Sequence, residues 1–200
     1  MRVRVPVLLA AASAAALAFA PAWGAGGSGL TLHPSGFGPH SYAAWKAQQG
    51  EADSTGGSNQ ALYLQKEVPT LTNAAGIAVI DGVAGMDTGD LNPLAFDIRD
   101  DSHCGAGAPR FNVVFHMPGG PQQTIFVGCA AMTESAPMGG GSNWHRRTIA
   151  QPLPSGGVVD SLAIVFDEGN EFSNPYAYLD DIQVGSKVWT SAADNGNTSG

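Results

Sequence analysis

The chain has 200 residues, with 9 Lys and Arg against 17 Asp and Glu, a formal net charge of −8, and a charged fraction of only 13%. This acidic balance excludes nucleic-acid binding, because phosphate recognition requires clustered Lys and Arg. Twenty-seven glycines and 13 prolines disfavour helices and favour short strands joined by turns, so the composition predicts an all-β protein.

The first 24 residues have the pattern of a secretory signal peptide. Arg2 and Arg4 are followed by an apolar run from Val7 to Ala20, and then by small residues that suit cleavage. The apolar run is too short to cross a bilayer comfortably, and no later stretch approaches membrane length. We therefore expect a secreted, extracellular or periplasmic protein without a transmembrane segment. Without Arg2 and Arg4, seven basic residues remain against 17 acidic ones, a net charge near −10.

Four strands and one helix are expected in the N-terminal half of the mature chain. Residues 41–49 have the helical pattern: Ser41 can cap the N-terminus, Ala43 and Lys46 favour helix, and Gly50 ends it. The strand patterns are rich in β-branched residues or alternate between apolar and polar residues. They cover residues 29–33, 61–65, 76–83 and 94–99.

The C-terminal half contains strand patterns and loops. A hairpin is expected from residues 110–116 and 123–127, with its turn at Pro118 to Pro121. Residues 133–143 form a loop rich in Gly, Pro and Ser, for which two interpretations stay open: a lid or binding loop, or a merely mobile segment. Further strands are expected over residues 146–150, 158–167, 177–184 and 187–190.

These elements predict a two-sheet antiparallel β-sandwich of jelly-roll type with one short helix near the N-terminus. Roughly eight to ten short strands separated by turns are typical of two packed sheets. The single helix is too small to cover a sheet, so the apolar faces of the sheets must be buried against each other. We expect this domain to span residues 25–190 and residues 191–200 to form a flexible polar tail.

The two cysteines of the chain, Cys104 and Cys129, flank the expected hairpin. In an exported protein, a lone pair is best explained as one structural disulfide that pins neighbouring strands. A redox or zinc-binding function is disfavoured, because the spacing is not that of a Cys-x-x-Cys motif and no paired Cys/His set is present.

Two segments resemble the carbohydrate-binding modules and galactose-binding-like domains of jelly-roll type. Residues 178–184 have the final-strand pattern of an aromatic, an apolar residue, Asp-Asp and then alternating apolar residues, and residues 57–64 are similar to an early strand. The segments around Cys104 and Cys129 resemble secreted bacterial proteins of this type. The resemblance implies a structural calcium in many such modules, held in part by an Asp of the final strand, and by position this implicates Asp180 or Asp181.

Acidic residues gather at strand ends and in loops. Calcium prefers such oxygen ligands, whereas Asp residues also punctuate turns by accepting hydrogen bonds from local backbone, and both interpretations stay open. A glycosidase would need an acid of raised pKa with a second carboxylate about 5–10 Å away. No spacing pairs the candidate acids, so a polysaccharide hydrolase is the weaker alternative. The calcium or turn candidates are Asp97, Asp100, Asp101, Asp167, Glu168, Asp180 and Asp181. The glycosidase candidates are Asp97, Asp160, Glu168 and Asp180.

Exposed aromatic residues would indicate carbohydrate binding, because the C–H faces of sugars stack on exposed rings. Trp144 follows a glycine-rich loop among polar residues, and Tyr176 and Tyr178 precede the Asp-Asp motif. We take these three as candidate ligand-binding residues, with Arg146 as a hydrogen-bond donor to a ligand. The competing interpretation is that the rings fill the core or cover strand edges.

The sequence as a whole predicts a non-catalytic module that recognises an extracellular or cell-envelope glycan, with structural calcium as the candidate cofactor. The alternative is a structural or adhesive surface protein with a protein partner. An exposed aromatic strip would favour glycan recognition, and a large apolar patch would favour a protein partner. Two carboxylates converging in a cleft would favour the hydrolase.

Overall fold

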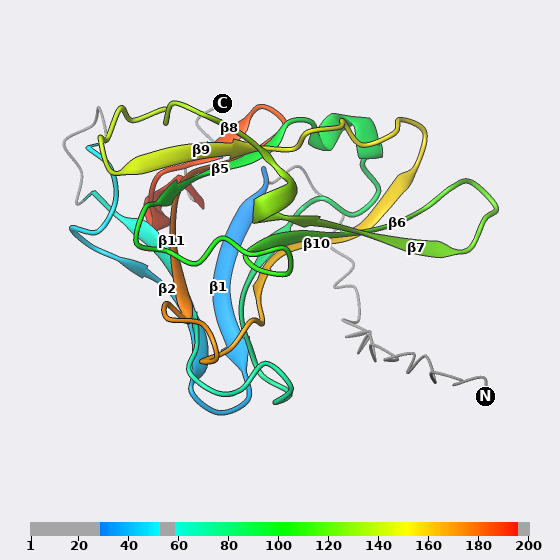
Figure 1. The fold of residues 1–200 in the computed structure, drawn as a ribbon. Helices are drawn as coiled ribbons and strands as arrows, with labels where there is room; N and C mark the ends of the chain where they lie inside the picture. The colour runs from blue at the N-terminus through cyan, green and yellow to red at the C-terminus, as the bar shows by residue number, and fades with distance from the viewer. Residues whose placement is uncertain (1–28, 53–58, 196–200) are drawn as a thin grey trace, which may run out of the picture.

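The computed structural model describes residues 29–52 and 59–195. The expected signal peptide, residues 1–24, lies outside the described residues. The described part is built of strands and three short 3-10 helices. Two of these helices lie between strands, η1 (Thr88–Leu91) and η2 (Cys129–Ala131), and η3 (Ala192–Asn195) follows the last strand. The strands form two packed antiparallel sheets, which confirms the expected β-sandwich (Figure 1).

The first sheet has five strands in the order β1-β4-β10-β6-β7. They are β1 (Thr31–Phe37), β4 (Ala75–Asp81), β6 (Arg110–His116), β7 (Gln122–Gly128) and β10 (Val158–Phe166). The second sheet has seven strands in the order β2-β3-β11-β5-β9-β8, with β12 paired to the end of β11. They are β2 (Ser41–Lys46), β3 (Ala61–Lys66), β5 (Leu94–Arg99), β8 (Thr133–Ser135), β9 (Trp144–Thr148), β11 (Tyr176–Val184) and β12 (Lys187–Trp189).

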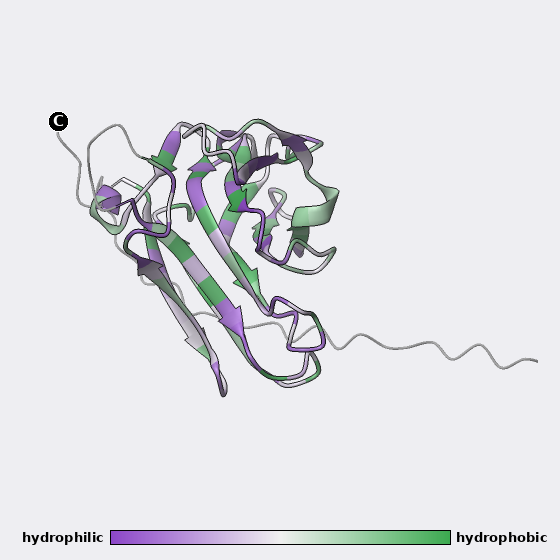
Figure 2. Cartoon of the chain, turned by 60° about the vertical axis from the view of Figure 1, so that its left-hand side comes forward, coloured by the Kyte–Doolittle hydropathy of each residue, from purple (hydrophilic) through white to green (hydrophobic). Residues whose placement is uncertain are grey.

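Alternation of apolar and polar residues along the strands buries one face of each sheet (Figure 2). In β6, Phe111, Val113 and Phe115 are buried, and the residues between them are partly exposed. One continuous apolar cluster, which includes Trp189 of β12, fills the space between the sheets. We call the side of the second sheet that points away from this core its outer face.

The expected helix over residues 41–49 is wrong, because Ser41–Lys46 forms β2. All six residues of β2 pair with β3, from Ser41 opposite Lys66 to Lys46 opposite Ala61. Ala43 and Trp45 pack against the core, whereas Tyr42 lies on the outer face. Helix propensity is a weak preference, and here a complete ladder of strand hydrogen bonds and an alternating pattern override it.

Several expected strands are confirmed with small changes at their ends. Residues 94–99 and 110–116 form β5 and β6 as expected. β1 begins later than the expected strand over residues 29–33 and continues beyond it through Pro34. Since β1 is the edge strand of its sheet, Pro34 can pair with Ala78 there although it lacks an N–H donor.

The expected hairpin and disulfide are both present. β6 and β7 pair from Arg110 opposite Gly128 to His116 opposite Gln122, and the hairpin projects to the right in Figure 1. The disulfide joins Cys104, in the loop before β6, to Cys129, directly after β7. The covalent bond therefore closes the open end of the hairpin rather than joining two paired strands.

A β-bulge in β11 explains the Asp-Asp motif. Asp180 pairs with Asp97 of β5, but the next pair joins Gln183 to Ala95, so β11 carries one extra residue. Leu179 and Ile182 both lie in the core. The bulge therefore turns the two consecutive aspartates, Asp180 and Asp181, to the outer face, and Asp181 adopts a φ of 43°.

Residues 192–195 pack onto the sandwich, beyond the expected end of the domain at residue 190. Residues 192–195 form η3, in which Asn195 Oδ1 accepts hydrogen bonds from Leu32 N at 2.7 Å and Trp189 Nε1 at 3.0 Å. These contacts involve the first residues of the expected tail, and residues 196–200 lie outside the described residues. None of the described helices has the length and apolar character needed to cross a membrane.

Candidate functional site

Four tyrosines from three neighbouring strands form one cluster on the outer face. Tyr42 comes from β2, Tyr63 from β3, and Tyr176 and Tyr178 from β11. The ring centroid of Tyr63 lies 5.7 Å from that of Tyr42, 5.9 Å from Tyr176 and 4.7 Å from Tyr178. Tyr42 is 37% exposed and the other three are half-buried. We call these four residues the tyrosine face.

The strand register explains how the tyrosine face forms. Tyr63 lies directly opposite Tyr178 in the ladder between β3 and β11, and Tyr42 lies opposite Gln65, two residues along β3. Opposite and diagonal residues on one face of a sheet are within reach of aromatic side chains. The cluster therefore needs β2 to be a strand, because only strand alternation turns Tyr42 to the outer face.

Two cationic side chains flank the tyrosines. Lys46 Nζ lies 5.2 Å from the ring centroid of Tyr42, and the guanidinium of Arg99 stacks 3.6 Å above that of Tyr178. Asp101 holds Arg99 in this position, with Nε–Oδ1 at 2.6 Å and Nη2–Oδ2 at 3.0 Å. The hydrogen bond from Arg99 lowers the pKa of Asp101. The site therefore combines aromatic faces with fixed polar groups.

Next to the tyrosine face, four acidic side chains converge beneath two loops. Asp180 follows Tyr178 by two residues on β11, and Asp97 precedes Arg99 by two residues on β5. Glu51 and Asp181 complete the group, and all four residues are buried, at 8% exposure or less. One carboxylate oxygen from each of Glu51, Asp97 and Asp181 lies within 4.8 Å of the other two. We call the four residues the carboxylate cluster.

The members of the carboxylate cluster are bonded in different ways. Both oxygens of Asp180 accept backbone N–H groups, from Glu51 at 2.7 Å and from Asp181 at 2.8 Å. Asp97 Oδ1 accepts a hydrogen bond from Arg146 Nη1 at 2.6 Å. Arg146 also donates to the backbone carbonyl of Asp181 and to Gln183. Asp180 thus holds the backbone at Glu51, and Arg146 supplies positive charge that pairs with the cluster.

The glycine-rich loop before β9 closes over the carboxylate cluster. Its backbone N–H groups donate to Asp97, from Met138 at 2.5 Å, and to Glu51, from Gly141 at 2.7 Å. A Cβ at Gly139 would lie 2.8 Å from Glu51 Cβ, so a larger residue would push the loop off the cluster. The loop therefore needs glycine because its backbone runs in contact with the acids.

Burial changes the acid–base behaviour of the cluster. It raises the pKa of Glu51 to about 8 and that of Asp180 to about 7, and it also raises the pKa of Asp181. Glu51 Oε1 is buried and accepts no hydrogen bond from any described residue. An all-oxygen donor set with such an unsatisfied acceptor suits a hard cation such as calcium better than zinc, which favours nitrogen and sulfur ligands.

The structure separates the candidate residues predicted from the sequence. Tyr176 and Tyr178 lie in the tyrosine face, and Asp181 lies among the converging carboxylates. Trp144 is only 4% exposed, so a sugar cannot stack on its ring in this arrangement. Arg146 is also buried, and its guanidinium is bonded to the carboxylate cluster rather than free for a ligand.

The sequence patterns do not identify Tyr42, Tyr63 or Glu51 as site residues, and they give Asp97 only as one candidate acid among several. Tyr42 lies within the expected helix. The alternation of the polar ring of Tyr42 with the apolar residues Ala43 and Trp45 is the pattern that indicates a strand. Glu51 has no local signal, because it comes from a loop that is distant in sequence from Asp97 and Asp181.

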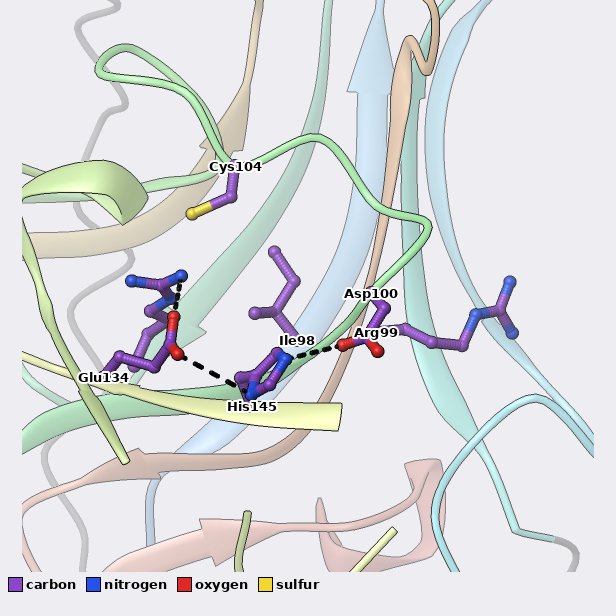
Figure 3. Close-up of a pocket in the computed structure, with 7 residues that line it drawn as sticks. Ile98, Arg99, Asp100, Cys104, Glu134 and His145 are labelled. Carbon is purple, nitrogen blue, oxygen red and sulfur yellow. Dashed lines mark ion pairs between the residues drawn. The ribbon is translucent and has the colours of Figure 1, made fainter. Parts of the chain in front are cut away.

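A cleft of about 320 Å³ lies further along the second sheet (Figure 3). His145 stands between two acids, with Nε2 2.9 Å from Asp100 and Nδ1 3.8 Å from Glu134, while Arg99 points away from it. Glu134 also pairs with Arg147. Because the imidazole fills the space between the two carboxylates, this arrangement lacks the room for water that an inverting glycosidase requires.

Comparison with known proteins adds no family to this description. No protein-family model and no curated protein sequence matches the chain.

Proposed function

We propose that the chain is a secreted, non-catalytic module that recognises an extracellular or cell-envelope glycan through the tyrosine face. The observation that carries this proposal is the contiguous, solvent-accessible cluster of Tyr42, Tyr63, Tyr176 and Tyr178 across three adjacent strands. Aromatic rings on a rigid sheet offer apolar area at a low cost in conformational entropy, and sugar C–H faces are suited to it.

Polar groups beside the rings support the same function. Lys46, Arg99 and Asp101 lie at the edges of the tyrosine face and can exchange hydrogen bonds with sugar hydroxyl groups. Arg99 is already oriented by Asp101, so little ordering of this side chain would be required on binding. The site thus has the mixture of apolar area and a few fixed polar groups that is typical of small-ligand sites.

Hydrolysis receives little support from the geometry. The acids that converge most closely are Glu51, Asp97 and Asp181, and all three are covered by loops. In the open cleft, His145 separates Asp100 from Glu134. A polysaccharide would therefore meet no pair of free carboxylates in either place, which favours binding without catalysis.

A protein partner is the second candidate, and one surface favours it. An apolar groove of about 330 Å³ lies beside β7, with Phe126, Pro152 and Leu153 among its lining residues. Phe126 is 57% exposed, and β7 is an edge strand of its sheet. Exposed apolar surface at a sheet edge is suited to protein contact.

Substitution of Tyr63 by alanine should separate these two functions. Tyr63 contacts the other three tyrosines, so its removal should weaken affinity for a glycan identified on an array by about tenfold or more, equivalent to about 1.4 kcal/mol. Tyr42→Ala, at the exposed margin, should cause a smaller loss. Affinity is measured by isothermal titration calorimetry.

Phe126→Ala is the matched control, because it removes an exposed aromatic ring from the other sheet. It should leave glycan affinity unchanged, and thermal melts should show that all three variants are folded. Unchanged affinity in Tyr63→Ala together with loss of affinity in Phe126→Ala would place ligand binding at the β7 groove and contradict the proposal.

A further inference from the structure

One buried oxygen of the carboxylate cluster lacks a partner. Glu51 is 4% exposed, and its Oε2 accepts a hydrogen bond from Gly141 N, but its Oε1 accepts none from any described residue. Glu51 lies beside Asp97 and Asp181, which are acceptors when they are ionised. An unsatisfied buried carboxylate oxygen is costly, so this position calls for a positively charged ligand or a proton.

The charge of the carboxylate cluster points in the same direction. Four carboxylates carry four negative charges when ionised, and Arg146 is the cation that pairs with them, which leaves a net charge of −3. Like charges held together away from water are strongly destabilising. A divalent cation would reduce the net charge to −1.

The surrounding backbone forms a close cradle around the cluster. A Cβ at Gly50 would lie 2.5 Å from Asp180 Oδ2, and a Cβ at Gly141 would lie 3.0 Å from Glu51 Oε2. The loop N–H groups of Met138 and Gly141 hold one oxygen each of Asp97 and Glu51. The acids are thus fixed in position by backbone contacts before any ion binds, which lowers the cost of assembling a binding site.

We propose that Glu51, Asp97 and Asp181 bind a divalent cation of the calcium type between the β2–β3 loop and the glycine-rich loop before β9. Asp180 is a positioning residue, because both of its oxygens are engaged by backbone N–H groups. The sequence-based assignment of Asp180 and Asp181 is thereby replaced by a site drawn from three separate segments. The ion would tie both loops to β5 and β11, beside the tyrosine face.

The chemistry of the site favours calcium among common cations. All its side-chain donors are oxygens, whereas zinc favours nitrogen and sulfur. Magnesium usually keeps several bound waters, and the ligands here are buried and closely surrounded. Calcium accepts carboxylate oxygens in variable geometry, which suits three acids drawn from separate segments of the chain.

Calcium chloride titrated into EDTA-treated, dialysed protein at pH 7.5 tests the site. Calorimetry should show saturable binding with one ion per chain, at roughly 10⁻⁶ to 10⁻³ M. The Tm should rise by roughly 5 °C or more when calcium is about 100-fold above its Kd. Glu51→Gln, Asp97→Asn and Asp181→Asn should each weaken calcium binding at least tenfold.

Asp160→Asn, which removes a partly buried acid from the other sheet, is the control and should bind calcium as the unsubstituted protein does. Terbium luminescence gives a second readout that does not require the variants to be stable, since terbium occupies calcium sites and calcium should displace it. The decisive condition is 10 mM calcium, which is about ten times the weakest Kd expected. If the unsubstituted protein shows no binding heat, no rise in Tm and no displaceable terbium there, the proposal is overturned. None of these measurements involves a glycan, so failure here leaves glycan recognition to be judged separately.

Discussion

Tyr178 and Asp180 are two residues apart on β11 and face the same way, yet their surroundings make them chemically different. Tyr178 is half-buried and stacked with Arg99, so its ring remains part of an accessible surface. Asp180 is buried and accepts a hydrogen bond from the backbone N–H of Glu51. At the residue scale, burial decides the role of each side chain. An accessible side chain can contact a ligand, whereas a buried one can only hold other residues in position.

The buried acids make stability depend on pH. Folding raises the pKa of Glu51 from 4.5 to about 8 and that of Asp180 from 3.8 to about 7, so the folded chain keeps protons that the unfolded chain loses. In EDTA, the free energy of unfolding should therefore decrease as pH rises from about 4 to about 8.

Thermal melts in EDTA at pH 5 and pH 8 measure this effect, and the Tm should be lower at pH 8. Glu51→Gln, which cannot ionise, should show a smaller decrease between the two values. A Tm that is the same or higher at pH 8 in the unsubstituted protein would show that burial does not retain these protons.

At the scale of elements, local sequence patterns predicted most of the strands. The features that they did not predict depend on pairing between segments that are distant in sequence. The β6–β7 hairpin was predictable because alternation, turn residues and flanking cysteines all agree. β2 was not, because Ala43 and Lys46 favour helix and the pairing partner β3 lies beyond an intervening loop. The bulge in β11 was partly visible in the sequence, since Leu179 and Ile182 are three positions apart and break strict alternation.

The disulfide is an element-scale feature with a measurable effect. Cys104 and Cys129 close a loop of 25 residues in sequence, and loss of this link should lower stability by about 3 kcal/mol through the greater freedom of the unfolded chain. In the double variant Cys104→Ser with Cys129→Ser, the Tm should fall by roughly 6–12 °C.

Reduction of the unsubstituted protein with dithiothreitol is the control and should give a similar decrease in Tm. Below that Tm, glycan binding should persist, because the disulfide lies outside the tyrosine face. An unchanged Tm in both experiments would mean that the bond contributes little to folding stability.

For the molecule as a whole, composition and periodicity predicted the all-β sandwich, but they could not assemble the site. Tyr63 and Tyr178 are opposite each other only because β3 pairs with β11, and Glu51 reaches Asp181 only through the folded loop. Such contacts depend on the order of strands in the sheet, which local sequence patterns do not predict. Trp144 illustrates the converse, since polar neighbours in sequence did not keep its ring at the surface.

We propose that the tyrosine face and the carboxylate cluster, which adjoin on the outer face, act as one functional unit. The tyrosine face is the surface proposed for the glycan, and the carboxylate cluster is the proposed ion site that fixes the adjoining loops. Gln49 of the β2–β3 loop accepts a hydrogen bond from Arg99 Nη1 at 2.9 Å, which connects that loop to the edge of the tyrosine face. Removal of the ion should therefore weaken glycan binding without abolishing the fold.

Binding of the purified protein to a broad glycan array, in calcium and again in EDTA, tests glycan recognition by the tyrosine face. We expect selective binding to a limited set of glycans in calcium and weaker binding to the same set in EDTA. An array without selective binding in either buffer would contradict glycan recognition by the tyrosine face and would favour a protein partner at the β7 groove.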